Sequence, residues 1–362
     1  MDDSCDLPLA VRDALAAAWG FSPRARFSPL GNGLINRTLL VSDDDGRQRV
    51  LQCLNTHVFR DPALVMRNCH AVTAHLGRER AAGRYGYSVL ELMPTLAGES
   101  AAVLSDGSWW RMYGHVPDTR TFDTADGTAM TRQAGRAFGA FAAALATLPA
   151  SEVGEVIPHF HDPVSRFEAF RTALQADLAS RASQCRDECE AAKRFANLLP
   201  HWQELLESGL PQRITHNDCK LNNLLFDDGG NAVCVVDLDT VMPGSLLFDF
   251  GDMARTMLSP VPEDSTDLAR VCARHDYFEA LASGYVEGCG ALLTPLEREN
   301  LLFGARLITG VIGLRFLTDH LDGDRYFRIT HPGHNLERAR NQLALFEALE
   351  RDSEALHALV PE

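Results

Sequence analysis

Strand-like and helix-like patterns are divided unevenly along this chain, and that division limits the folds open to it. Strand-like runs dominate from Phe27 to Val116, among them RTLLVS, QRVLQCL, YSVLELM and SWWRMYGHV. One helix, predicted from Pro62 to Leu76 with Asp61 as its N-cap, interrupts them. From TAMTRQAGRAFGAFAAALATL onward, helical stretches continue to the C-terminus, broken mainly around residues 213–245. The pattern predicts an α+β fold in which a small β-rich lobe precedes a larger, mainly helical lobe.

The length of the chain supports the same division. With 362 residues, of which 46% are hydrophobic, it exceeds the usual size of a single domain. We therefore expect an N-terminal lobe at residues 1–115, a hinge or linker at 116–126 and a C-terminal lobe at 127–362. A cleft between two lobes is a common place for a small ligand.

Charge and composition narrow the possible partners. The formal net charge is −15 and no run of Lys or Arg forms a basic patch, so nucleic acid and anionic membranes are not expected partners. The start, MDDSCDLPLAVRDALAAAWGF, is acidic and unlike a signal peptide. No apolar run was found that reaches the roughly 18 residues needed to span a bilayer. These features predict a cytoplasmic protein, whose oligomeric state one sequence does not reveal.

The cysteines fit that compartment. Their number, nine, is odd and they are scattered, which is unlike a disulfide framework and predicts reduced thiols. Cys185 and Cys189 lie four positions apart in a helical stretch, where they are either part of a metal site or buried small hydrophobic residues. The absence of a neighbouring Cys or His pair favours the second interpretation.

A dense group of polar residues stands where a strand should enter the core. The stretch THNDCKLNNLLF, which begins at Thr215, is followed by FDDGGNAVCVVDLD, a pattern typical of a strand, a tight turn and a second strand. A hairpin of this kind would bring Asp218 and Asn223, which precede it, next to Asp237, which ends it. The alternative is a polar loop whose Asp and Asn side chains cap its own backbone.

Phosphoryl transfer has a use for this group of residues. The reaction needs a carboxylate to orient the attacking hydroxyl, and an amide oxygen and a second carboxylate to hold Mg²⁺ on the nucleotide phosphates. His216, Asp218 and Asn223 fit the H-x-D-x-x-x-x-N spacing of a kinase catalytic loop. His216 is expected to hold the loop by hydrogen bonds, and Asp239 either contributes to the site or satisfies backbone donors.

Lys220 is a second argument for this chemistry. Only two of the 34 basic residues are lysines, Lys193 and Lys220, so the chain uses arginine almost wherever it needs a positive charge. A compact ammonium on a flexible stem can approach a phosphate as a point charge. Two positions after Asp218, Lys220 would neutralise charge that develops on the transferred phosphoryl group. The alternative is an exposed lysine without a role.

These residues resemble a known group of enzymes. HNDCKLNN followed by CVVDLDTVMPGSLLFDFGD is similar to the aminoglycoside phosphotransferase and choline kinase superfamily, whose fold is kinase-like and bilobal. NDCKLNN together with DLDTVMPG, NTHVF and RFLTD resembles the N-acetylhexosamine 1-kinases within it. Those enzymes phosphorylate the anomeric hydroxyl of N-acetylglucosamine or N-acetylgalactosamine with ATP and Mg²⁺. The resemblance extends over most of the chain, from GNGLINRTLLV to HNLERARNQ.

The resemblance implies roles for particular residues. It implies Asp218 as the catalytic base and Asn223 and Asp237 as metal ligands. The loop Gly31, Asn32, Gly33 to Asn36 would cover the phosphates, and the strand end with Tyr113, His115 and Val116 would meet adenine. Arg315 and Tyr326 would contact the sugar, although an internal salt bridge for the arginine and simple packing for the tyrosine are the alternatives.

One feature departs from the family pattern. Kinases of this shape place a Lys or Arg on the third strand, paired with a Glu on the following helix. Here Gln52 holds the strand position, and the helical stretch PALVMRNCHAVTAHL contains no Glu. Either Lys220 takes over the phosphate charge, which is our hypothesis, or Arg67 reaches the site.

Two alternative functions follow from these limits. The chain is a kinase of another small hydroxyl substrate, such as an aminoglycoside, choline or another sugar, or it is a pseudokinase that binds nucleotide without turnover. Retention of both carboxylates and the asparagine argues against the second.

Overall fold

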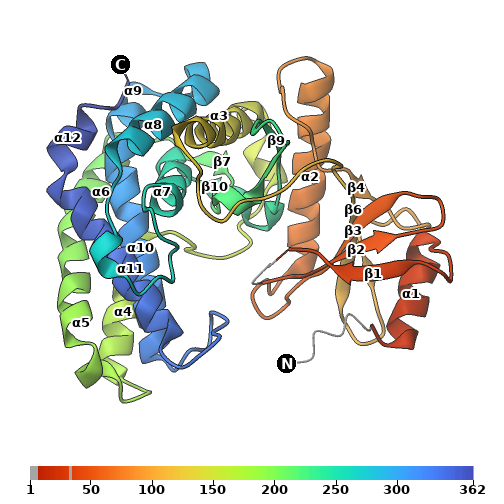
Figure 1. The fold of residues 1–362 in the computed structure, drawn as a ribbon, viewed down its shortest axis with the longest axis horizontal. Helices are drawn as coiled ribbons and strands as arrows, with labels where there is room; N and C mark the ends of the chain where they lie inside the picture. The colour runs from red at the N-terminus through yellow and green to blue at the C-terminus, as the bar shows by residue number, and fades with distance from the viewer. Residues whose placement is uncertain (1–6, 32–34, 362) are drawn as a thin grey trace.

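The computed structural model describes residues 7–31 and 35–361 of the chain. It has a small lobe built on an antiparallel sheet and a larger lobe built mostly of helices (Figure 1). The predicted α+β architecture of two lobes is therefore confirmed. The small lobe holds α1 Leu9–Trp19, β1 Arg26–Pro29, β2 Arg37–Ser42, β3 Gln48–Cys53, α2 Pro62–Ala81, β4 Leu92–Met93, β5 Ala102–Val103 and β6 Trp109–Gly114.

The sheet of the small lobe has the strand order β1-β2-β3-β6-β4, and β5 pairs with the outer part of β6. RTLLVS forms β2, as predicted, and pairs in register with β3 from Arg37 opposite Cys53 to Ser42 opposite Gln48. YSVLELM was expected to be one strand, but only Leu92 and Met93 join the sheet. The start of this stretch bonds to the large lobe instead: the Ser88 amide donates to the carbonyl of Val233, in the second strand of the later hairpin, at 2.8 Å.

Helix α1 covers one face of this sheet. Leu15 and Trp19 pack with Leu39 and Val41 of β2 and with Met112 of β6 in a small hydrophobic core. The helix ends at Gly20, whose φ of 74° is the left-handed conformation in which glycine is the favoured residue. This core packs against β2, β3 and β6, the strands whose residues line the cavity between the lobes.

Helix α2 connects the two lobes (Figure 1). Asp61 is its N-cap, as predicted, and accepts a hydrogen bond from the Leu64 amide at 2.9 Å. The helix continues to Ala81, beyond the predicted end at Leu76. Its apolar residues Val65, Cys69 and Val72 belong to the core of the large lobe. The sheet and the catalytic lobe are therefore connected by shared packing as well as by the segment 116–126, whose role as a hinge stays a prediction.

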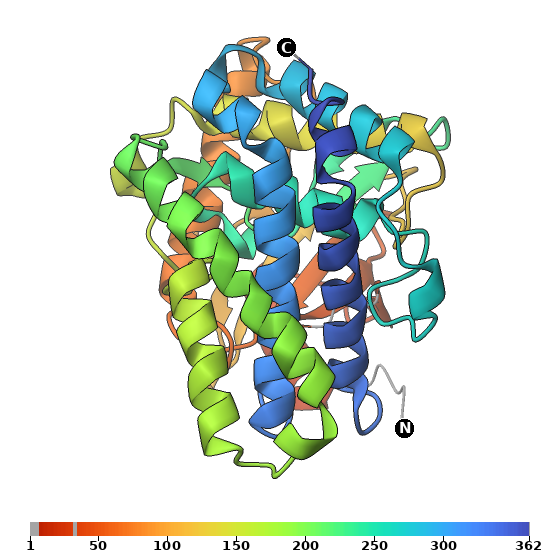
Figure 2. The same ribbon diagram turned by 90° about the vertical axis from the view of Figure 1, so that its left-hand side faces the viewer.

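The large lobe contains short strands near the cleft and a layered set of helices. Its elements are α3 Thr128–Leu145, α4 Pro163–Ala176, α5 Arg186–Lys193, α6 Leu199–Glu207, β7 Arg213–Thr215, β8 Leu224–Phe226, β9 Ala232–Val235, β10 Met242–Gly244, α7 Leu246–Met257, α8 His275–Cys289, α9 Pro295–Glu299, α10 Leu301–Leu321, α11 His334–Arg351 and α12 Ser353–His357. Helix α10 runs through the middle of this lobe beside α11 (Figure 2).

The central helix corrects one statement of the sequence analysis. Leu301–Leu321 is long enough and apolar enough to cross a membrane by length and composition, which the sequence had seemed to exclude. In the described part of the chain it is the single helix of that kind, and 83% of its most apolar window is buried inside the protein. Its apolar surface faces α4, α7 and α11, so its composition is accounted for by packing within the large lobe.

Cysteine side chains in the described residues are free thiols, and most are buried. The Sγ atoms of Cys185 and Cys189 are 3.9 Å apart in the core. Burial raises the pKa of Cys189 to about 12. Cys185 and Cys189 therefore pack as buried hydrophobic residues, which is the second of the two interpretations.

Helices α3 and α8 approach each other unusually closely because both carry glycines at a spacing of four. Gly135 and Gly139 of α3 face α8, and Gly284 and Gly288 of α8 face α3. A Cβ atom at position 135 would lie 2.6 Å from the Leu281 carbonyl oxygen and 2.9 Å from the Tyr285 amide nitrogen. Backbone atoms in a packed helix cannot move aside as a flexible side chain can.

We expect Gly135→Ala to lower the free energy of unfolding by about 1–3 kcal/mol, because an added methyl group overpacks this contact. Gly77→Ala on α2 is the matched control, since a Cβ there meets nothing within 4 Å. That control should be neutral or stabilising by up to about 1 kcal/mol, because alanine favours a helix over glycine. Urea denaturation of the two variants measures both values. A Gly135→Ala protein as stable as the wild type would contradict the close contact.

Candidate active site

The predicted hairpin is present and brings the candidate residues together. Strands β8 and β9 pair with Leu224 opposite Val235, and the Val236 amide donates to the Asn223 carbonyl at 2.9 Å. Asp237 follows directly, in a left-handed conformation with φ of 59°. A non-glycine residue in that region is strained, which often marks a functional position.

A carboxylate side chain of α7 accepts hydrogen bonds from the backbone of the loop before the hairpin. The Asp249 carboxylate accepts from the His216 amide at 3.1 Å and from the Asn217 amide at 2.7 Å. Asn217 has a φ of 61°, and its side-chain amide donates to the carbonyls of Thr215 and Thr240. Burial raises the pKa of Asp249 to about 6, against the opposing effect of these donors. These hydrogen bonds fix the backbone conformation of the loop.

His216 is fully buried, between Phe138 and Phe141. Its Nδ1 accepts a hydrogen bond from the Asp218 amide at 3.3 Å, and its Nε2 lies 2.9 Å from the Val236 carbonyl. Because a carbonyl only accepts and an amide only donates, the ring is the neutral tautomer with the proton on Nε2. Both nitrogens are occupied by backbone groups, which agrees with the predicted role in holding the loop.

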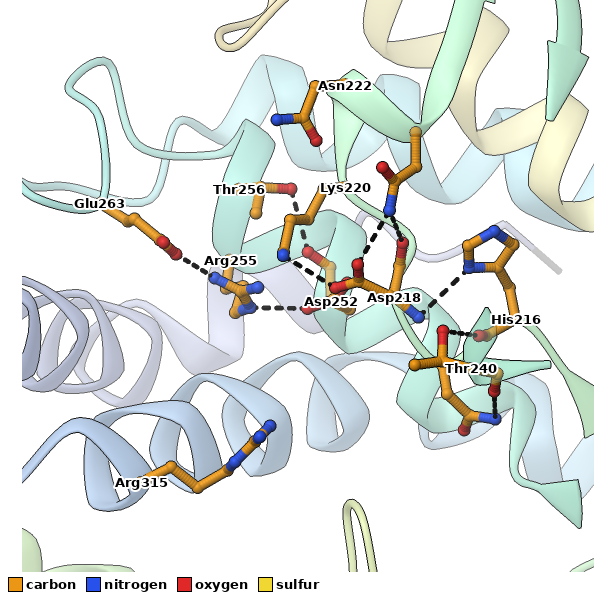
Figure 3. A network of polar contacts seen from close by, with 12 residues as sticks. His216, Asp218, Lys220, Asn222, Thr240, Asp252, Arg255, Thr256, Glu263 and Arg315 are labelled. Atoms are coloured by element: carbon orange, nitrogen blue, oxygen red, sulfur yellow. Dashed lines mark hydrogen bonds and ion pairs between the residues drawn. The ribbon is translucent and has the colours of Figure 1, made fainter. Parts of the chain in front are cut away.

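Asp218 forms one connected group with Lys220, which Figure 3 shows beside it, and with Asn223. The Lys220 Nζ lies 2.9 Å from Asp218 Oδ1, and the Asn223 side-chain amide donates to Asp218 Oδ2 at 2.9 Å and to its carbonyl at 2.8 Å. Burial alone would raise the pKa of Asp218, but the Lys220 ammonium outweighs it and holds that pKa at about 2. Asp218 is therefore an anion at any physiological pH.

Asn223 and Asp237 have oxygen atoms suited to Mg²⁺. Both hydrogens of the Asn223 amide are used by Asp218, so its Oδ1 is left as an acceptor. No ion pair within the described residues neutralises Asp237, and burial together with the charges of Asp239 and Asp218 raises its pKa to about 6. A cation would relieve this uncompensated charge. Mg²⁺ commonly takes one or two protein ligands and completes its shell with phosphate and water, so the pair fits that ion.

A second ion-pair network, of Arg255 with Asp252 and Glu263, lies near Lys220. Arg255 of α7 is buried and donates to Asp252 at 2.6 Å and to Glu263 at 2.5 Å. Figure 3 shows this network on the side of Lys220 away from His216. The sequence motifs did not identify it, although the acidic run LLFDFGD lies in the family-like stretch.

A cavity of about 540 Å³ lies between the lobes and collects most of the predicted residues. Five of them line it from the small-lobe side and linker, and four from the catalytic loop and hairpin: Gly31, Asn36, Tyr113, His115, Val116, Asp218, Lys220, Asn223 and Asp237. The predicted Asn32 and Gly33 lie outside the described residues. Thr38, Gln52 and Thr121 also line the cavity and were not predicted as ligand contacts.

A buried arginine stands on the strand next to β3, where a lysine or arginine was expected. Arg111 of β6 lies opposite Gln52 of β3 and forms an ion pair with Asp239, and both of these charged side chains are inaccessible to solvent. Arg111 does not line the cavity, so its charge does not replace the expected cation directly. Arg67 is exposed on α2 and does not line the cavity, so the suggestion that it reaches the site is wrong. Helix α2 does extend to a glutamate, Glu79, but that residue bonds Arg84.

Arg315 and Tyr326 lie together but outside the cavity lining. Arg315 donates to the Tyr326 hydroxyl at 3.4 Å, and its guanidinium lies over the rings of Phe160 and Phe327. No carboxylate in the described part of the chain forms an ion pair with it, so the salt-bridge alternative is not what the structure has. Figure 3 shows Arg315 reaching from α10 toward the side of the catalytic loop. Contact with a sugar stays a prediction.

His161 connects this cluster to the catalytic loop, and it was missed because an isolated histidine has no sequence signature. Its Nε2 lies 2.8 Å from the Asn217 carbonyl, and its ring packs against Phe160. Burial and the charge of Arg315 lower the pKa of His161 to about 3, so this ring is neutral.

Comparisons with known proteins bear on the family and the fold. The model of a family described as phosphotransferase enzyme family matches residues 26–283. Among solved structures, an aminopropanol kinase associated with a microcompartment is 17% identical with a TM-score of 0.65, over 96% of this chain and 98% of that one. An amicoumacin kinase bound to AMP-PNP and Ca²⁺ is 15% identical with a TM-score of 0.64, over 92% of both chains. A spectinomycin phosphotransferase bound to ADP and spectinomycin is 11% identical with a TM-score of 0.60, over 94% and 98%. At these identities the structures show a shared fold.

Proposed function

Because this chain belongs to the phosphotransferase enzyme family, we propose that it transfers the γ-phosphoryl group of ATP to the anomeric hydroxyl of an N-acetylhexosamine, with Mg²⁺. The general reaction, phosphorylation of a hydroxyl group on a small molecule, follows from the family. The amino sugar, the nucleotide and the metal are the proposed part. N-acetylglucosamine and N-acetylgalactosamine are equally compatible with the observations.

The observation that carries this proposal is the grouping of Asp218, Asn223 and Asp237 on one wall of the cavity between the lobes. Asp218 would accept a hydrogen bond from the acceptor hydroxyl and orient it for in-line attack. Its pKa of about 2 makes it a weak base, so its contribution is to orientation more than to early removal of the proton. Lys220 would balance the charge on the transferred group.

Asn223 and Asp237 would hold Mg²⁺, which supplies charge neutralisation and a fixed geometry for the phosphates when bound. The adenine would lie near Tyr113, His115 and Val116, at the opposite end of the cavity. Position and charge account for most of the catalysis in this class of reaction, because the protein has little covalent chemistry to perform.

The guanidinium groups near Tyr326 support a neutral acceptor. Arg166 donates to the Phe160 carbonyl at 3.0 Å, and burial together with the nearby Arg315 lowers its pKa to about 10. Two guanidinium groups close together would repel a cationic aminoglycoside or choline. Aromatic rings such as Tyr326, whose side chain is 45% exposed, suit the apolar face of a sugar.

We expect ³¹P NMR of the protein with ATP and Mg²⁺ to show a new phosphomonoester signal when an N-acetylhexosamine is added, with coupling to the anomeric proton. Parallel samples contain aminoglycosides, choline and unmodified hexoses. Product on one of those acceptors alone would replace the amino sugar with that substrate. ATP binding without product on any acceptor would favour the pseudokinase alternative.

A further inference from the structure

Arg111 is the centre of a buried polar network between the lobes. Its ion pair with Asp239 uses one end of the guanidinium, while Nε and Nη2 donate to Gln52 Oε1 at 3.0 and 2.8 Å. Asp239 in turn accepts from the Asn36 side-chain amide at 2.6 Å. The network therefore contacts two residues of the cavity lining, Gln52 and Asn36, although Arg111 itself does not line the cavity.

The chemistry of arginine determines which way the Gln52 amide faces. A guanidinium has five hydrogen-bond donors and no acceptor, so only the oxygen of Gln52 can face Arg111. The nitrogen of the amide is then directed away from Arg111, where it donates to Thr38 Oγ1 at 3.0 Å. Thr38 also lines the cavity. Two bonds from the planar guanidinium converge on Gln52 Oε1 and prevent the amide from reversing.

We propose that Gln52 is the small-lobe group that contacts the phosphates of the bound nucleotide, and that Arg111 is a positioning residue that presents the Gln52 Nε2 donors to them. This inference rests on the proposed nucleotide-dependent function. Thr38 and Gln52 share one Nε2 hydrogen in the structure, so the second remains available to a phosphate oxygen. The positive charge of Arg111 is itself used by Asp239, which makes the contact from β3 a neutral donor. The cation next to the phosphates is then Lys220, on the opposite wall.

A merely structural role for Gln52 predicts a different outcome. In that case Gln52 only satisfies the donors of Arg111, and a carboxylate of the same size would do so equally well or better. Gln52→Glu keeps an acceptor oxygen for Arg111 but replaces the donor amide with an anionic oxygen. Gln52→Met keeps the size, removes the donors and also removes the acceptor oxygen. The two variants therefore separate support of Arg111 from contact with the nucleotide.

The experiment measures the Kd for MgATP by isothermal titration calorimetry, the KM for ATP and the thermal unfolding temperature. For Gln52→Met we expect the Kd to rise roughly tenfold to a hundredfold, the effect of losing a hydrogen bond to a charged group. For Gln52→Glu we expect a larger rise, because an anion then faces the phosphates, with an unfolding temperature close to that of the wild type. The KM for the acceptor should change little in either.

Gln48→Glu is the matched control, since Gln48 is exposed on the same strand and does not line the cavity between the lobes. It should leave the Kd for MgATP unchanged. A folded Gln52→Glu protein that binds MgATP within about threefold of the wild type would overturn the inference. A wild-type protein that does not bind MgATP would overturn the proposed function instead.

Discussion

Asp218→Asn should lower kcat by about 10³, within the range of 10²–10⁴ that a positioned acid or base group contributes. Asparagine has nearly the same shape, but it lacks the negative charge and the second acceptor oxygen. The acceptor hydroxyl would lose the group that orients it toward the phosphoryl group. The KM for ATP should change much less, because the proposed role of Asp218 is to orient the acceptor and not to hold the nucleotide.

Steady-state kinetics with the acceptor identified by NMR measures this effect. Asp228→Asn is the matched control, because Asp228 is an exposed carboxylate on the turn of the same hairpin and does not line the cavity. The control should keep wild-type activity. A kcat for Asp218→Asn above about a tenth of the wild-type value would remove Asp218 from its proposed role.

Lys220→Ala should lower kcat by about 10²–10³, because charge on the transferred phosphoryl group would lose its compensating ammonium. The chain has one other lysine, Lys193, which is exposed and paired with Glu190 at 2.7 Å. Lys193→Ala is therefore the matched control and should be fully active. Nearly unchanged turnover in Lys220→Ala would contradict the role of this residue.

The pH dependence separates two causes of that loss. Lys220 is also the group that holds the pKa of Asp218 at about 2 against the effect of burial. Its removal would raise that pKa, and a loss due to protonation of Asp218 would be recovered as the pH rises and the carboxylate ionises. A loss due to missing charge on the phosphoryl group would persist at high pH. We expect the second behaviour, with the ratio of the wild-type to the variant kcat nearly constant between pH 7 and 9.

Local patterns predicted the parts of the site that depend on neighbours in the chain. The spacing of His216, Asp218 and Asn223 and the strand, turn and strand that follow are determined over a short segment, and the hairpin confirms their arrangement. The N-cap at Asp61 is equally local. The strand β2 was predicted with its observed bounds because alternation and a tight acidic turn both lie within a few residues.

Predictions that depended on distant partners were less complete. YSVLELM has the composition of a strand, yet most of it leaves the sheet because Ser88 pairs with the hairpin of the other lobe. The apolar composition of Leu301–Leu321 gave no indication of which surfaces would bury it. Arg111 was overlooked because its partner, Asp239, is more than a hundred residues away in the sequence.

The sequence by itself determined the spacing of the polar residues in the loop before the hairpin and the division into a β-rich and a helical lobe, since both depend on short-range spacing and propensity. Only the tertiary structure decided which groups surround the glutamine that stands in place of a lysine on β3. The missing lysine is visible in the sequence, but the contact of Gln52 with Arg111 requires that β6 lie beside β3, and the loop after β9 must place Asp239 against Arg111. Arg111 and Asp239 are both buried, and they pair because an unpaired charge in the protein interior is costly.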